Sequence, residues 1–179
     1  MDKPKPNKLV VGHGAIVEYA KTVLKGEITI GKGTIVHPTV QILAEGGPIH
    51  IGCNNLLEEG VIIHNKPSED GEERTMTIGN NNYFEVRSQS SALTMGDNNV
   101  LQVTAKLGSD VRLGNGCVIG VGMCIKNKQL QDVTHLYQRD GMIQQRIGRE
   151  LPQSQTQQID YLKNMIPSYH KIHKPTNTD

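Results

Sequence analysis

A short glycine-containing motif recurs six times, and its spacing constrains the fold of this 179-residue chain more than any other feature. Each copy is an aliphatic residue or methionine followed by Gly, one variable residue, and Gly or Asn. Successive copies begin 19, 21, 27, 17 and 18 residues apart, at Val11, Ile30, Ile51, Ile78, Met95 and Leu113. A period near eighteen, which is three sixes, is typical of a stacked solenoid.

The finer period is six residues. Aliphatic residues and methionine follow one another at this spacing without a break from Met95 through Leu107 to Ile125. An amphipathic helix needs apolar residues three and four apart, and a single strand needs alternation. A period of six instead predicts a triangular coil with three short strands per turn. The sequence therefore predicts an all-β fold, a left-handed parallel β-helix of hexapeptide repeats with about six coils; the hand follows known hexad solenoids and departs from the usual crossover rule.

Two features refine this prism. Stacking the turns places Asn55, Asn82 and Asn99 in one column, which predicts an asparagine ladder that satisfies polar groups at a buried corner. The spacings above eighteen locate two insertions, a short one near 44–48 and a longer, acid-rich one between His64 and Thr77. We expect both to be loops that leave the corners of the prism.

The hexads end after Ile125, so the β-helix is expected to span 8–130. Residues 131–150 are expected to form a capping strand or hairpin, since an open last coil presents unpaired edges. Residues 151–173 are expected to form a C-terminal α-helix, kinked or divided at Pro167. Its apolar stripe is expected to pack on a flat face of the prism rather than to remain free for binding a partner protein. Residues 174–179 are expected to be a disordered tail.

Composition argues against several classes of function. The formal net charge is +1, there is no Trp and a single Phe, so neither charge nor stacking favours nucleic acid as a partner. No apolar run approaches the length needed to span a bilayer, so no direct membrane insertion is expected. The first eight residues lack the apolar core of a signal peptide, and the odd count of three cysteines indicates reduced thiols. The chain is expected to be cytoplasmic.

The histidines do not predict a metal site. A catalytic zinc site needs three ligands that converge on one ion with one position open. The seven histidines, which lack that spacing, are His13, His37, His50, His64, His135, His170 and His173. His64 opens the long insertion and is the only candidate general base for acyl transfer, but no carboxylate lies near it in sequence, so a solvated corner histidine is the preferred interpretation. Cys117 takes an inward position and is expected to act as a small buried hydrophobe.

Neighbouring carboxylates do not form a catalytic pair either. Glu58 and Glu59 are adjacent on a strand, so their side chains are expected to point to opposite faces. We therefore expect no catalytic, cofactor-binding or metal-ligating residues, and no cofactor.

The whole chain resembles the dynactin subunit 6 family. The tail is the most specific part of the resemblance; the matching stretches are 28–38, 42–49, 78–86, 95–100, 158–162 and 166–170. The resemblance implies a non-catalytic structural or adaptor subunit in the pointed-end complex of dynactin, which supports the attachment of dynein to cargo. It implies a cytoplasmic, cytoskeleton-associated heteromer rather than a homotrimer. The implied partners are the sister β-helix dynactin subunit 5, other pointed-end subunits and the end of the actin-related filament.

The alternative hypothesis is a hexapeptide-fold enzyme, either an acyltransferase or an enzyme like the γ-carbonic anhydrases. It rests on fold-level analogy and predicts a homotrimer with zinc or coenzyme A at the subunit clefts. For the adaptor hypothesis, we expect a flat side of the prism to contact the sister subunit and the loop between 64 and 77 to make a second contact.

Overall fold

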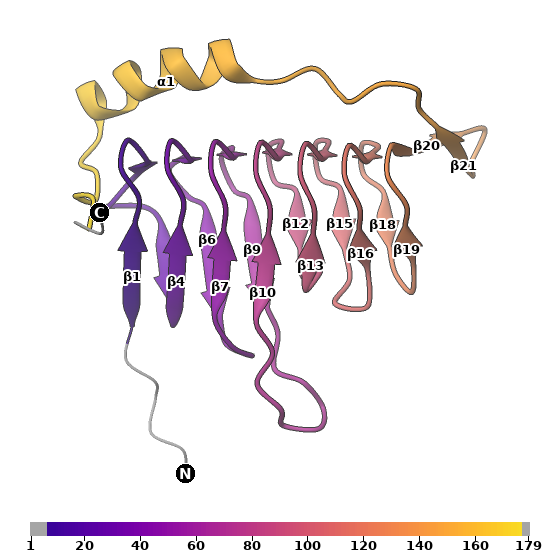
Figure 1. Cartoon of the computed structure of the whole chain (residues 1–179), viewed down its shortest axis with the longest axis horizontal. Coiled ribbons are helices and arrows are strands. Elements are labelled where there is room, and N and C mark those ends of the chain that lie inside the picture. Colours follow the sequence, from indigo (N-terminus) through magenta and orange to yellow (C-terminus); the bar gives the residue numbers. More distant parts are fainter. Residues whose placement is uncertain (1–6, 177–179) are drawn as a thin grey trace.

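The computed structural model describes residues 7–176 as a three-sided prism of parallel sheets with one helix along it (Figure 1). The first sheet contains β1 (Lys8–Val11), β4 (Glu27–Ile30), β7 (Ile49–Ile51), β10 (Met76–Ile78), β13 (Thr94–Met95), β16 (Arg112–Leu113) and β19 (Gln129–Leu130). The second contains β2 (Ile16–Val17), β5 (Ile35–Val36), β8 (Leu56–Leu57), β11 (Tyr83–Phe84), β14 (Val100–Leu101), β17 (Val118–Ile119), β20 (Thr134–Arg139) and β21 (Met142–Ile147). The third contains β3 (Val23–Lys25), β6 (Gln41–Ala44), β9 (Ile62–Asn65), β12 (Gln89–Ser90), β15 (Lys106–Leu107) and β18 (Cys124–Ile125).

The predicted fold class is confirmed. The chain forms a left-handed β-helix in which every strand pair is parallel except β20 with β21. The motif aliphatics stack in register along the first sheet, for example Ile51 on Ile78 and Met95 on Leu113, and their side chains are buried. The first sheet has seven strands, where about six coils were expected. The seventh turn escaped the motif count because Gln131 follows its inward Leu130, where the other turns have glycine.

The predicted asparagine ladder is present. The backbone N–H of Asn82 donates to Oδ1 of Asn55 at 2.8 Å, and the N–H of Asn99 donates to Oδ1 of Asn82 at 2.9 Å. The column continues into the next turn, where the N–H of Cys117 donates to Oδ1 of Asn99 at 2.7 Å. All four residues are buried. Each side chain therefore satisfies a backbone donor that water does not reach.

The long insertion leaves one corner of the prism as a loop, as expected. β9 ends at Asn65 and β10 begins at Met76, and the intervening loop projects from the prism below the start of β10 (Figure 1). The buried amide of Asn65 fastens the base of the loop, because its Nδ2 lies 2.7 Å from the carbonyl oxygen of Arg74 and 2.9 Å from that of Gly47. A Cβ at Gly46 would collide with the backbone of Lys66, so the short insertion needs glycine where it passes the long one.

The helix is shorter than expected and lies on one flat face of the prism. α1 (Thr156–Tyr169) falls within the expected 151–173, and it is not divided at Pro167. It packs on the outer side of the second sheet (Figure 1), through buried and partly buried contacts of Ile159, Leu162 and Ile166 with Ile16, Ile35 and Leu56. The structure thus places the apolar stripe of the helix against its own prism.

The segment after the helix closes the N-terminal end of the second sheet. Ile172 forms an antiparallel bridge with Glu18, next to the end of β2. The flanking hydrogen bonds run from Tyr19 N–H to Lys171 O (2.8 Å), from His173 N–H to Val17 O (2.8 Å) and from Thr176 N–H to Val11 O (2.9 Å). The expected disordered tail therefore differs from the structure over 174–176, which lie against the first turn; 177–179 lie outside the described residues.

Candidate interaction surfaces

The histidines of the described chain do not converge. Within residues 7–176, no group of three His, Cys, Asp or Glu side chains is placed to hold a metal ion. His37 lies at the corner after β5 with Nδ1 2.8 Å from Oε1 of Glu59. His64 lies in β9, a strand of the third sheet, whereas the helix covers the second sheet. These two histidines each have a partner of their own and do not form one site.

His64 has a carboxylate partner that the sequence did not reveal. Its Nε2 lies 2.8 Å from Oε2 of Glu45, which is 19 residues earlier and one turn away. Lys25, another turn away, reaches the second oxygen of Glu45 at 2.7 Å. The hydrogen bonds from Lys25 and His64 lower the pKa of Glu45, although burial opposes this. The three side chains form a hydrogen-bonded row at the surface, in which Lys25 and Glu45 are an ion pair, and none of them lines either hollow described below.

Glu58 and Glu59 are directed to different partners, as expected, but they lie in the turn after β8 and not on a strand. Whereas Glu59 contacts His37, Oε1 of Glu58 accepts the hydroxyl of Tyr83 at 2.6 Å and the amide of Gln158 at 3.3 Å. Burial and the bond to Glu58 together raise the pKa of Tyr83, so the phenol remains a donor. Glu58, Tyr83 and Gln158 join the helix to the prism, so their role is to hold the helix in position.

Cys117 lies at an inward corner, as the hexad pattern predicted. Burial raises the pKa of its thiol, and Sγ donates to the carbonyl oxygen of Gln131 at 3.3 Å. A buried thiol that stays protonated is a poor nucleophile. The structure therefore uses Cys117 as a packing residue in the polar column.

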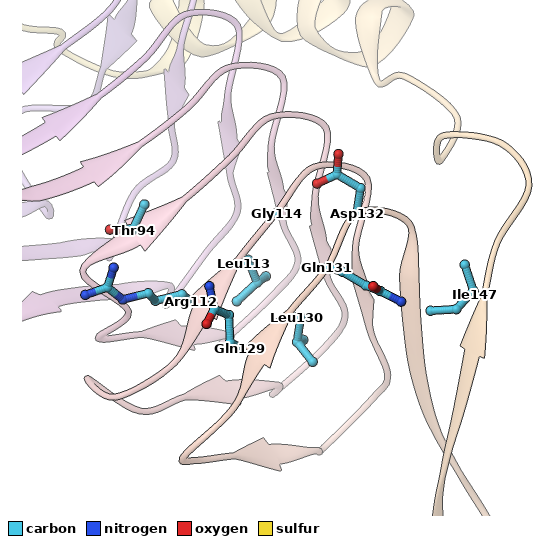
Figure 2. A pocket seen from close by; sticks show the side chains of 9 residues that line it. All are labelled: Thr94, Arg112, Leu113, Gly114, Gln129, Leu130, Gln131, Asp132 and Ile147. Atoms are coloured by element: carbon cyan, nitrogen blue, oxygen red, sulfur yellow. The ribbon is translucent and has the colours of Figure 1, made fainter.

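A large hollow lies at the C-terminal end of the prism (Figure 2) and has a volume of about 900 Å³. It is lined by Thr94, Arg112, Leu113, Gly114, Gln129, Leu130, Gln131, Asp132 and Ile147. Asp132 is already engaged, because its Oδ1 accepts the N–H of Asn115 at 2.8 Å. The lining combines apolar side chains, amides and one guanidinium, and it pairs no nucleophile with a base. These groups suit contact with another polypeptide better than covalent chemistry.

A second, smaller hollow lies between the start of the helix and the asparagine corner. It has a volume of about 110 Å³ and is lined by Asn54, Asn81, Asn82, Ser154, Gln155, Thr156, Ile159, Asp160 and Lys163. Its walls are mostly amides and hydroxyls. It marks the seam where the helix begins to pack on the prism.

Some of the exposed apolar side chains lie at the same end as the large hollow. Four large ones lie on the β20–β21 hairpin: Tyr137, Met142, Ile143 and Ile147. Others lie on the outer side of α1 at Tyr161 and Tyr169, and on the first turn at Tyr19 and Val23. The sequence pattern of hexads did not indicate the hairpin surface, because that surface lies beyond the last regular repeat.

These features define a hexapeptide-repeat β-helix whose described surfaces suit contact with other proteins. No family model matches the chain. In comparisons with known proteins, it is 41% identical to dynactin subunit 6 of Xenopus tropicalis over 93% of this chain and 85% of that protein. It is 37% identical to dynactin subunit 6 of Nematostella vectensis over 97% and 96%. The chain belongs to the dynactin subunit 6 family.

One solved structure shows how widely the architecture is shared. A candidate acetyltransferase of Bacillus cereus superposes with a TM-score of 0.66 over 88% of this chain and 86% of that one, at 13% identity. At that identity the likeness concerns the fold alone. No helix among residues 7–176 is long and apolar enough to cross a bilayer.

Proposed function

We propose that this chain is a non-catalytic structural and adaptor subunit of dynactin. The observation that carries the proposal is its 41% identity to a dynactin subunit 6 over most of both chains. In this proposal the chain belongs to the pointed-end complex, pairs with dynactin subunit 5 and other pointed-end subunits at the end of the actin-related filament, and supports the attachment of dynein to cargo. It acts in the cytoplasm with the cytoskeleton, as part of a heteromer rather than a homotrimer.

The physical properties of the prism support this role. Each turn is hydrogen-bonded to its neighbours along three sheets. The helix packs through apolar contacts on the outer side of the second sheet. Such a body keeps its two ends at a fixed separation, which is what a spacer within a large assembly requires. The histidines and carboxylates of the described chain form separate pairs at the surface and the corners, which supports a role without catalysis.

Affinity purification and intact mass measurement together test the proposal. The tagged full-length chain, expressed in cells of its own species, is expected to recover dynactin subunits in fixed stoichiometry and no homotrimer. Recovery of no dynactin component would overturn the proposal. A homotrimer carrying zinc or coenzyme A would instead favour the enzyme hypothesis.

A further inference from the structure

The two ends of the second sheet are treated differently. At the N-terminal end, the chain's own segment 170–176 covers the first turn. At the C-terminal end, the outermost strand is β21, which pairs only with β20 among residues 7–176. Exposed apolar edge strands attract further strands, and proteins usually protect them with proline, charge or a bulge. β21 has no proline and a single charged residue, Arg146.

The backbone groups at the free edge of β21 can be identified from one hydrogen bond. The N–H of Gly148 donates to the carbonyl oxygen of Val133 at 2.7 Å, directly opposite it in the antiparallel register. Hydrogen-bonded pairs alternate along such a ladder. The backbone groups of Met142, Gln144 and Arg146 therefore face β20. Those of the intervening Ile143, Gln145 and Ile147 face outward.

The side chains beside this edge combine apolar surface with positive charge. Ile143 and Ile147 share one side of β21 and are 56% and 46% exposed. Figure 2 shows Ile147 facing Gln131 across the large hollow. Arg146 lies on the other side of the strand. Residues 121–150 contain five cationic and three anionic side chains.

Two of those three anions already have partners. Asp132 accepts a backbone N–H, and Asp140 lies 3.8 Å from Nε of Arg139. The backbone bond does not neutralise Asp132, and the Arg139–Asp140 pair involves one charge of each sign, so residues 121–150 keep a formal excess of two positive charges around the free edge. This charge favours a partner with acidic side chains at the edge, because electrostatic complementarity across an interface suppresses partners of like charge.

We infer that the free edge of β21 binds an extended segment of another protein as an additional strand. Its apolar side chains contact Ile143 and Ile147, and its acidic side chains face Arg146. A second copy of this chain fits less well, since an antiparallel pair centred on Gln145 would make the two Arg146 side chains diagonal neighbours on one side of the sheet. The inference says where one contact within the proposed assembly lies and which side chains make it. It rests on the proposed function only in assuming that the chain belongs to an assembly.

Amide hydrogen exchange on the full-length chain tests the backbone part directly. The probe is a peptide of about ten residues in which valine and glutamate alternate. Binding is expected to slow exchange at the N–H groups of Ile143, Gln145 and Ile147 by about tenfold or more, and to leave the already bonded N–H groups of Gln144 and Arg146 unchanged. A matched peptide with lysine in place of glutamate is expected to protect none. Absence of protection by the glutamate peptide overturns the inference.

Substitution at Gln145 separates strand addition from contact through side chains. Gln145→Pro removes one outward N–H while leaving the bonds to β20 in place, and it is expected to weaken peptide binding about tenfold or more. Gln145→Ala keeps the N–H and is expected to bind as the parent does. Slow exchange at Gln144 and Arg146 checks that the hairpin persists. Equal binding by Gln145→Pro with an intact hairpin overturns the inference.

A side-chain variant covers the case in which proline disrupts the hairpin. The double substitution Ile143→Glu and Ile147→Glu preserves every backbone group and is expected to lose peptide binding about tenfold or more. The matched control Val23→Glu changes an exposed apolar residue at the other end of the prism and is expected to bind as the parent does. Equal binding by the double variant overturns the inference.

Two further outcomes separate this inference from its rivals. A dimer at micromolar concentration, with the N–H groups of Ile143, Gln145 and Ile147 protected in the absence of peptide, identifies a second copy as the occupant and overturns the proposed partner. If the parent chain recovers dynactin and the Ile143→Glu, Ile147→Glu variant recovers as much, the inference fails while the proposed function stands. If the parent recovers no dynactin, the proposed function fails, and the peptide experiment alone decides the inference.

Discussion

Thr176 and Val11 are 165 residues apart in the chain and are joined by two hydrogen bonds. The N–H of Thr176 donates to the carbonyl oxygen of Val11 at 2.9 Å, and the N–H of Val11 donates to Oγ1 of Thr176 at 3.0 Å. The first turn of a solenoid has no preceding turn to bond to. The segment 171–176 supplies that missing neighbour, so it stabilises the first turn.

Removing this segment is therefore expected to destabilise the prism from its N-terminal end. Truncation after Tyr169 deletes four hydrogen bonds to the first turn and the contact of Ile172, which should lower the free energy of unfolding by about 2–4 kcal/mol. Urea denaturation measures the loss, and exchange at the Tyr19 N–H should accelerate. Lys174→Ala, at an exposed position, is the control and should be neutral. An unchanged unfolding curve for the truncated chain would show that the segment does not stabilise the first turn.

Glu18 is expected to make stability depend on acid pH. The side chain is 1% exposed; burial alone would raise its pKa, but hydrogen bonds from the N–H groups of Lys21, Ala20 and Thr22 outweigh burial and lower it below the ordinary 4.5. The unfolded chain then binds more protons than the folded one. The stabilisation is complete above the ordinary pKa and is lost as pH falls through the folded-state pKa.

Glu18→Gln tests this dependence. At pH 7 it should lower the free energy of unfolding by about 1.5–3 kcal/mol, because bonds to a charged acceptor are replaced by weaker ones. Between about pH 5 and pH 3 its stability should fall less than that of the parent chain. Glu27→Gln, which removes an exposed pair with Lys8, serves as the control and should change stability little at pH 7. Parallel pH profiles for Glu18→Gln and the parent would contradict the assignment.

The asparagine ladder is expected to matter most where water is excluded. Asn82→Ala leaves the buried N–H of Asn99 without an acceptor and should cost about 2–4 kcal/mol. Asn115→Ala removes a similar bond to the N–H of Asp97, but at an exposed corner, and should cost less than about 1 kcal/mol. Chemical denaturation of the two variants gives the comparison. Equal costs would mean that burial does not set the strength of the ladder.

The inward hexad positions are expected to reject charge. Leu107 is 4% exposed in the core, and Leu107→Asp should cost at least about 5 kcal/mol and unfold the prism, because it buries an unpaired carboxylate. Lys106→Asp places the same charge one residue earlier on the outer side of β15 and should leave the fold intact. Circular dichroism and thermal unfolding distinguish the two. A folded Leu107→Asp protein would contradict the inward orientation.

The long loop is expected to be dispensable for folding, whereas its anchor is not. Replacing residues 67–73 by two glycines should change the free energy of unfolding by less than about 1 kcal/mol, since loop length contributes weakly. Asn65→Ala should cost about 2–3 kcal/mol, because its amide donates to the carbonyl groups of Gly47, Pro48 and Arg74. Thermal unfolding of both variants provides the measurement. A loop deletion that unfolds the protein would show that the loop carries core contacts.

The sequence contains a pattern that indicates which face the helix covers, but counting the inward hexad positions does not reveal it. In the first three turns the residue before the inward aliphatic is also apolar, at Ile16, Ile35 and Leu56, and these outward residues are the ones that α1 covers. An apolar outward row predicts a covered face. The pair His64–Glu45 had a weaker signal, because residues one turn apart become neighbours only once the register is known.

The sequence by itself determined the repeating body of this protein: the inward aliphatics, the asparagine column and the loop positions. It could do so because each turn contacts only the turns beside it, so a local period specifies the packing. Only the tertiary structure decided which face the helix covers, that the segment after it bonds to Val11 and Val17, and that β21 remains uncovered. These contacts join residues that are far apart in the chain and outside the repeat, so their geometry depends on where the helix and the segment after it run along the finished prism.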